Sequence, residues 1–196
     1  MYGKEIRGAE PKRGDVIGIK RHGVYKHYAV YIGNDEVIHY ANPDGKGDDI
    51  LGRDNTIHRA PMANFLKGNE KDEFFVLDFP TKEELKKKMI AKKMAEGATV
   101  LPFLGILFAI AKVTREVVKI IRDMDYKLYS AEETVERAMS RLNEKKYNLA
   151  TNNCEHFAIW CKTGAKESHQ VENVMDFISM TPVKFALPFA SSFTRL

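Results

Sequence analysis

The first part of the chain, to about Pro80, alternates between short β-type segments and turn residues, and this pattern limits the folds open to it. The segments are rich in β-branched and aromatic residues, whereas Gly, Asn, Asp and Pro stand between them. Short connections join antiparallel strands, because parallel strands need a long crossover. We therefore predict an antiparallel β-meander. Its predicted strands are 15–20, 27–32, 36–41, 56–59 and 73–78.

The middle of the chain, from about 81 to 122, has a helical composition. A lysine-rich stretch comes first, and the longest uncharged apolar run, 97–111, follows it. That run is shorter than the roughly 20 residues that a membrane-spanning helix needs. We interpret the chain as a single domain over 1–170, with a basic and apolar helical insertion at about 81–128. An apolar C-terminal tail, 171–196, contains two prolines that oppose a regular spanning helix.

Two helices are predicted near the C-terminal end of the domain. Ser130 and Glu133 form a Ser-x-x-Glu capping box at the start of the first. Apolar residues then recur at helical spacing, namely Val135, Ala138, Met139 and Leu142. The second helix is predicted to begin at Asn152 or Asn153, as its N-cap, and to end at Gly164. Helices that pack against a meander make an α+β fold.

Composition and charge restrict the class of protein only loosely. A hydrophobic fraction of 44% can fill a core. The net charge of +4 is mild: it is compatible with an anionic surface as a partner but does not show one. We expect no nucleic-acid partner. The N-terminus has no apolar segment of a secretory signal. Cys154 and Cys161 lie two helical turns apart, about 10 Å, which is too far for a disulfide. We expect an intracellular protein, cytoplasmic or peripherally membrane-associated.

Cys154 falls in the first turn of the last predicted helix. The unpaired N–H groups and the positive dipole end of a helix stabilise a thiolate and lower its pKa. The same N–H groups can hold a developing oxyanion, so a cysteine there suits acyl chemistry. The alternative is a small buried hydrophobe, because Cys154 shares a helix face with Phe157 and Cys161. We assign Cys161, which has no such position, to the core.

Two histidines, His27 and His39, lie on consecutive predicted strands. A nucleophilic thiol needs a base, and histidine has a suitable pKa near neutral pH. A second polar group must orient that base. We therefore consider His27 as the base and His39 as its orienting partner. The alternative for each is a half-buried strand residue with local hydrogen bonds.

The loop between these strands decides whether the histidines share a face. A three-residue loop, 33–35, pairs Ile32 with Glu36 and Ala29 with His39, and both histidines then lie on one face. A two-residue loop, Asn34-Asp35, puts the two histidines on opposite faces unless a bulge intervenes. Three-residue loops are common, and Gly and Asn tolerate the left-handed conformation that they need. We predict the three-residue loop.

The remaining histidines carry less information. His22 and His58 are predicted to lie on the surface, and His156 is predicted to make a structural polar contact because it points to another helix face than Cys154. No close-spaced Cys and His ligands occur, so we expect neither a metal nor another cofactor.

Three stretches together resemble the lecithin:retinol acyltransferase family. They are Pro11–Ile17 (PKRGDVI), His27–Gly33 (HYAVYIG) with Val37–Tyr40 (VIHY), and Asn152–Phe157 (NNCEHF). The resemblance implies a circularly permuted papain-like fold with the catalytic cysteine at a helix N-terminus. Carried over by position, it implies Cys154 as nucleophile, His27 as general base and His39 as the third, orienting residue.

The resemblance also implies a reaction. Such enzymes attack a glycerophospholipid ester, form an acyl-cysteine thioester and pass the acyl group to water, an amine or an alcohol. A phospholipid substrate and contact with a membrane surface follow. A lysine-rich helix beside an apolar run suits docking on an anionic bilayer, and it equally suits a buried helical hairpin with a solvated outer face. Two other functions stay open: a cysteine peptidase or amidase on the same scaffold, and a non-enzymatic membrane-binding adaptor.

Overall fold

The computed structural model describes residues 3–21, 25–44, 54–67, 74–96, 103–148 and 152–165. The predictions for His22 and for the tail 171–196 lie outside these residues. The strands are β1 (Lys4–Arg7), β2 (Val16–Arg21), β3 (Tyr25–Gly33), β4 (Glu36–Ala41), β5 (Thr56–Pro61) and β6 (Phe74–Asp78). The helices are α1 (Met62–Leu66), α2 (Lys82–Glu96), α3 (Phe103–Asp123), α4 (Ala131–Met139) and α5 (Cys154–Thr163).

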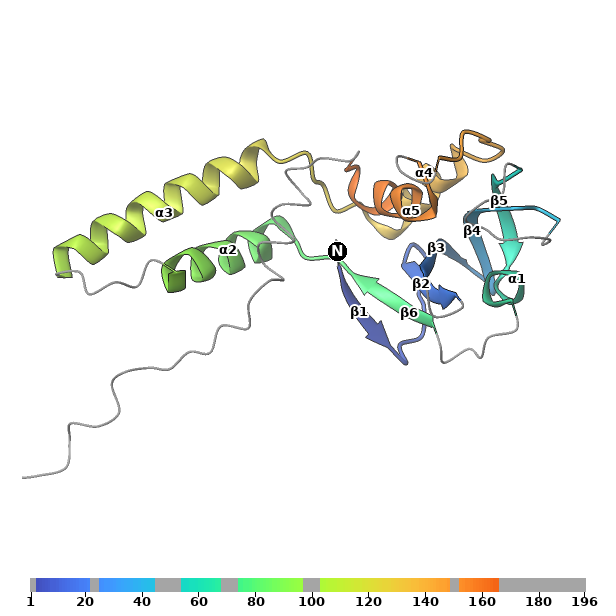
Figure 1. Cartoon of the computed structure of the whole chain (residues 1–196), viewed down its shortest axis with the longest axis horizontal. Coiled ribbons are helices and arrows are strands. Elements are labelled where there is room, and N and C mark those ends of the chain that lie inside the picture. Colours follow the sequence, from blue (N-terminus) through green and yellow to red (C-terminus); the bar gives the residue numbers. More distant parts are fainter. Residues whose placement is uncertain are drawn as a thin grey trace, which may run out of the picture.

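The strands form one antiparallel sheet in the order β1-β6-β2-β3-β4-β5. The predicted α+β class is confirmed, and β2 to β5 are the predicted meander. The prediction missed β1, and it placed β6 last in the meander, whereas β6 returns to lie between β1 and β2. Figure 1 shows α4 and α5 side by side against the sheet, and α1 at its β4–β5 end.

The sheet has two buried faces, because successive side chains along a strand point to opposite sides. On one face, even-numbered residues of β3 such as Tyr28 and Val30 pack with Val135 of α4 and Phe157 of α5. On the other face, Ala29 of β3 packs with residues of β2, β4 and α1. The strand β3 is thus buried from both sides.

The turn between β3 and β4 differs from the prediction in one respect. Gly33 pairs with Glu36, so the loop has two residues, Asn34 and Asp35, and both have a φ of 53°. Positive φ at both central positions is the type I′ geometry, whose twist matches that of the strands. The predicted three-residue loop, with Ile32 opposite Glu36, is therefore wrong.

A β-bulge restores the predicted pairing further along the strands. The register shifts between Tyr31 and Gly33, and Ile32 is the extra residue. Ala29 consequently faces His39, as the sequence predicted. The bulge therefore places His27 and His39 on one face although the loop is short.

Arg13 ties this bulge to α4. Its guanidinium donates a hydrogen bond to the carbonyl oxygen of Ile32, and it pairs with the Glu132 carboxylate, with 2.9 Å between Nε and Oε1. Beside it, the Gly14 amide donates to the Tyr31 carbonyl oxygen and the Tyr31 amide donates to the Asp15 carbonyl oxygen, both at 2.8 Å. The segment before β2 thus fixes the end of β3 against the helical layer.

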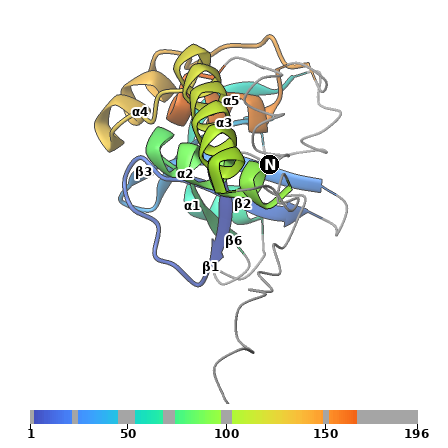
Figure 2. The ribbon, with the colours of Figure 1, turned by 90° about the vertical axis from the view of Figure 1, so that its left-hand side faces the viewer.

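The helices α2 and α3 form a hairpin that projects from the sheet body, and Figure 2 shows them in front of the sheet. Leu85 and Met89 of α2 pack with Val117 and Ile121 of α3 in a separate apolar cluster, which also contains Met124, Tyr126 and Ala165. At the base of the hairpin, the Tyr126 hydroxyl donates to the Pro80 carbonyl oxygen at 2.6 Å. Within the described residues, neither these nor the other helices are long and apolar enough to cross a membrane.

Gly14 provides a test of the contact between the segment before β2 and α4. Its φ is +83°, and an added Cβ would lie 2.4 Å from the Cα of Ala131. We expect Gly14→Ala to lower the free energy of unfolding by about 3 kcal/mol or more, because left-handed strain and steric overlap add. Chemical denaturation monitored by circular dichroism measures this loss.

Gly8 is the matched control for Gly14. Its φ is +71°, but an added Cβ would meet no atom within 4 Å. Gly8→Ala should therefore show the strain alone, about 1 to 2 kcal/mol. Equal losses in the two variants would contradict the close contact between Gly14 and Ala131.

Candidate active site

Cys154 is the first residue of α5, and a capping box fixes the start of that helix. The Asn153 side-chain oxygen accepts hydrogen bonds from the amides of Glu155, at 2.9 Å, and His156, at 3.0 Å. The His156 ring nitrogen Nδ1 accepts in turn from the Asn153 amide at 3.4 Å. The predicted N-cap, the end at Gly164 and the structural role of His156 are confirmed.

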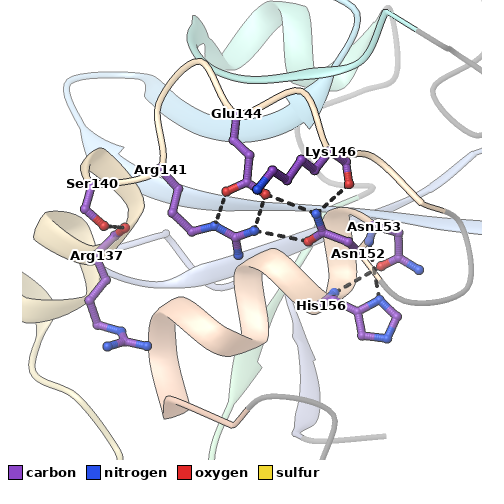
Figure 3. Close-up of polar contacts among 8 residues, drawn as sticks. All are labelled: Arg137, Ser140, Arg141, Glu144, Lys146, Asn152, Asn153 and His156. Atoms are coloured by element: carbon purple, nitrogen blue, oxygen red, sulfur yellow. Dashed lines mark hydrogen bonds and ion pairs between the residues drawn. The ribbon is translucent and has the colours of Figure 1, made fainter.

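A second polar cluster holds the segment that leads into α5, and Figure 3 shows it beside the cap. Arg141 forms a two-pronged ion pair with Glu144 and donates to the side-chain oxygen of Asn152 at 3.1 Å. The side-chain nitrogen Nδ2 of Asn152 donates to Glu144 at 3.0 Å and to the Lys146 carbonyl oxygen at 2.6 Å. No sequence pattern predicted this cluster, because Arg141 and Glu144 lie beyond the end of α4, where helical spacing does not apply.

The thiol of Cys154 is largely buried, with 7% of the residue exposed. It belongs to the cluster of the α4–α5 face, with Tyr28 and Tyr40 among its members. Cys154 therefore has both features that the sequence offered as alternatives: it lies at a helix start, and it packs in the core. Cys161 is fully buried in the same cluster, and burial raises the pKa of its thiol, which confirms the core assignment. No disulfide joins the two cysteines.

His27 and His39 lie in direct contact on the other face of the sheet. Their ring nitrogens, Nε2 of His27 and Nδ1 of His39, are 3.0 Å apart, so one donates a hydrogen bond to the other. Both residues are buried. Phe65 of α1 stacks on His27, with 5.4 Å between ring centroids, and presents its edge to His39. The helix α1, which the sequence did not predict, covers the histidine pair.

His58 is a third member of this cluster, and its predicted surface position is wrong. It is half-buried and pairs with His39 across β4 and β5, with 4.7 Å between ring centroids. Its Nδ1 donates to the Thr56 carbonyl oxygen at 2.9 Å. The connection between β4 and β5 is long, so the sequence alone does not show that His58 pairs with His39.

The surroundings of His27 favour a neutral imidazole. Burial lowers its pKa to about 3, and the positive charges of Arg21 and Lys67, with His58, act in the same direction. The buried Arg21 guanidinium donates to the carbonyl oxygens of Phe65 and Leu66, at the C-terminal end of α1. At neutral pH the His27 imidazole is therefore unprotonated.

The three predicted site residues are divided between the two faces of the sheet. His27 and His39 are brought together on the α1 side, whereas Cys154 lies in the cluster on the α5 side. Tyr28, the neighbour of His27 in the chain, belongs to the Cys154 cluster, and the pKa of its hydroxyl is raised by burial, with Glu155, Glu5 and Cys154 adding to the effect. Among the described residues, His, Cys, Asp and Glu side chains form no group that could hold a metal ion.

A cysteine at a helix start and a hydrogen-bonded histidine pair define a candidate thiol-enzyme site. The sequence model of the family described as lecithin retinol acyltransferase matches residues 9–167, and the chain belongs to this family.

Three relatives are similar over most of the chain. Phospholipase A and acyltransferase 3 of Mus musculus is 26% identical over 178 residues, which cover 90% of this chain and 86% of the relative. The human protein of the same name is 26% identical, over 85% of this chain and 79% of its own. Lecithin retinol acyltransferase of Mus musculus is 24% identical, over 86% of this chain and 61% of its own.

The cap of α5 can be tested separately from that of α4. Asn153→Ala should lower the free energy of unfolding by about 1 kcal/mol and change the alkylation rate of Cys154 by iodoacetamide, because the start of α5 loosens. Ser130→Ala removes the capping box of α4 and is the matched control. It should cost a similar free energy and leave the alkylation rate unchanged. The cap would have no part in positioning Cys154 if both variants reacted at the wild-type rate.

The buried neutral histidine predicts a pH dependence of stability. The pKa of His27 in the folded protein is about 3, below its ordinary value of 6.5. The unfolded chain therefore binds the proton first as the pH falls, and stability is lost below about pH 6.5, by up to about 1.4 kcal/mol per pH unit. Denaturant unfolding at several values between about pH 7 and pH 5 measures the slope. His27→Gln should flatten it, and an unchanged slope in that variant would contradict the assignment.

Proposed function

We propose that this chain is a thiol-dependent acyltransferase and phospholipase A-type hydrolase, with a glycerophospholipid as acyl donor. Cys154 is the nucleophile, His27 the general base and His39 the residue that orients it. The observation that carries this proposal is the hydrogen bond between His27 and His39 in a member of this family that begins α5 with Cys154. The names of the relatives, which speak of phospholipase A and acyl transfer, support the reaction class.

In the first half of the reaction, His27 takes the thiol proton as the sulfur of Cys154 attacks the ester carbonyl carbon. His39 holds Nε2 of His27, so Nδ1 is the nitrogen that meets the thiol. The lowered pKa of His27 supports proton transfer during attack rather than a resting thiolate–imidazolium pair. Collapse of the tetrahedral intermediate expels the lysophospholipid alkoxide, which takes the proton back from His27.

The second half transfers the acyl group from the sulfur. Water, an amine or an alcohol gives its proton to His27 and attacks the thioester carbon, and Cys154 leaves as thiolate and is reprotonated. The Asn153 cap already takes the amides of Glu155 and His156. We assign the oxyanion donor of the first turn to the Cys154 amide, because it belongs to the nucleophile itself at the helix N-terminus.

The order of the site residues along the chain supports a finer proposal about the fold. In papain-like proteases the cysteine precedes the histidine in sequence. Here both histidine strands precede the cysteine helix. We propose that the domain is a circularly permuted papain-like fold.

Intact mass spectrometry after incubation with phosphatidylcholine vesicles tests the mechanism. The wild type should carry an acyl adduct that hydroxylamine removes, and Cys154→Ala should carry none. His27→Gln should form the adduct about 100-fold or more slowly, because it lacks the general base. Cys161→Ala is the matched cysteine control and should acylate like the wild type. An adduct on Cys154→Ala, or neither adduct nor lipid turnover in the wild type, would contradict the proposal; labelling by peptide-directed thiol probes would then indicate a peptidase.

A further inference from the structure

The outer face of α3 is unusually apolar for an exposed surface. Large hydrophobic residues with substantial exposure in the described part of the chain are Ile6 on β1 and four residues of α3, and Leu107 and Phe108 are exposed by 50% and 76%. Leu107, Ala111 and Val118 recur at helical spacing and, with Phe108, form what we call the α3 stripe. Packing against α2 does not use this stripe, because the inward face of α3 is formed by Val117 and Ile121.

Basic side chains run alongside the stripe. The exposed cations of α3 recur at i, i+3, i+7 and i+10, which is one helix face, and they are Lys112, Arg115, Lys119 and Arg122. Phe108 lies on the same helix face as these cations, one turn before Lys112. The start of α3 is the end that lies farther from the sheet (Figure 1). An apolar tip beside a cationic row is the pattern of a helix that lies in a bilayer interface.

The hairpin also holds the positive charge of the protein. Its two helices contain ten basic and five acidic residues, an excess of five, whereas the whole chain has a net charge of +4. The rest of the chain is therefore slightly acidic. A partner attracted by charge would meet the hairpin first, and that partner must be anionic and must accept apolar side chains.

We propose that the α3 stripe and the cationic row beside it dock the protein on an anionic phospholipid bilayer, with Leu107 and Phe108 inserted among the acyl chains. Charge complementarity distinguishes this partner from a second copy of the chain, whose hairpin would bring like charges together. The proposal goes beyond the proposed acyl transfer and does not need the nucleophile. Docking would hold the body of the protein next to a lipid surface.

Vesicle flotation tests the proposal. The wild type and Cys154→Ala should both float with vesicles of phosphatidylcholine mixed with phosphatidylglycerol, and less with phosphatidylcholine alone. Arg115→Gln with Lys119→Gln should weaken binding to the mixed vesicles about tenfold or more, as should Leu107→Gln with Phe108→Gln. All four positions are exposed, so circular dichroism should show an unchanged fold.

Matched controls come from exposed residues outside the hairpin. Lys4→Gln with Lys20→Gln removes two exposed cations, and Ile6→Gln removes an exposed apolar side chain. Both should float like the wild type. Equal binding to neutral and anionic vesicles, or equal losses in the controls and the α3 variants, would overturn the proposal. So would a wild-type dimer in size-exclusion chromatography that Leu107→Gln with Phe108→Gln converts to a monomer, because the stripe would then be an interface between copies.

Discussion

The alternation of side chains along β3 is the constraint on which the rest of the structure depends. One set of side chains, with Tyr28 and Val30, forms the floor under α4 and α5. The other set presents His27 and Ala29 to α1. A slip of one residue would exchange the two sets and bury the imidazole under α5. The bulge at Ile32 is what allows a two-residue turn and a shared histidine face to coexist.

A buried histidine pair is costly unless each ring has a polar partner. The contact between His27 and His39 supplies one, and α1 closes the cluster from outside. Arg21 links these features, because its guanidinium binds the end of α1 and its charge disfavours protonation of His27. The same packing that stabilises the fold therefore keeps the proposed base neutral.

The sequence predicted those features that depend on neighbours in the chain. The capping residues Ser130 and Asn153 were found because a cap is a contact over three residues. The predicted pairing of Ala29 with His39 is correct, but for a different reason: the loop has two residues, not three, and the bulge at Ile32 supplies the extra residue. The sequence predicted Cys154, His27 and His39 as site candidates. It did not predict that Cys154 packs on the α5 face of the sheet and the histidines on the α1 face.

Features that depend on distant pairing were missed. The strand β1 is short and mostly exposed, and it pairs with β6 from the far end of the sheet, so no local pattern predicts it. The helix α1 has five residues, too few for a periodic signal. Its Phe65 contacts both histidines and is recognisable only once β5 is paired with β4. His58 was misassigned for the same reason.

We propose that Cys154, His27 and His39 act as one site, although Cys154 packs in the cluster under α5 and the histidines pack against Phe65 of α1. A crystal structure of the acyl adduct on Cys154, trapped with a slowly hydrolysed ester, tests it most directly. We predict that Nδ1 of His27 lies within about 3 to 4 Å of the Cys154 sulfur, with His39 still bonded to Nε2. A His27 Nδ1 that lies more than about 5 Å from the sulfur in the adduct would contradict the proposal.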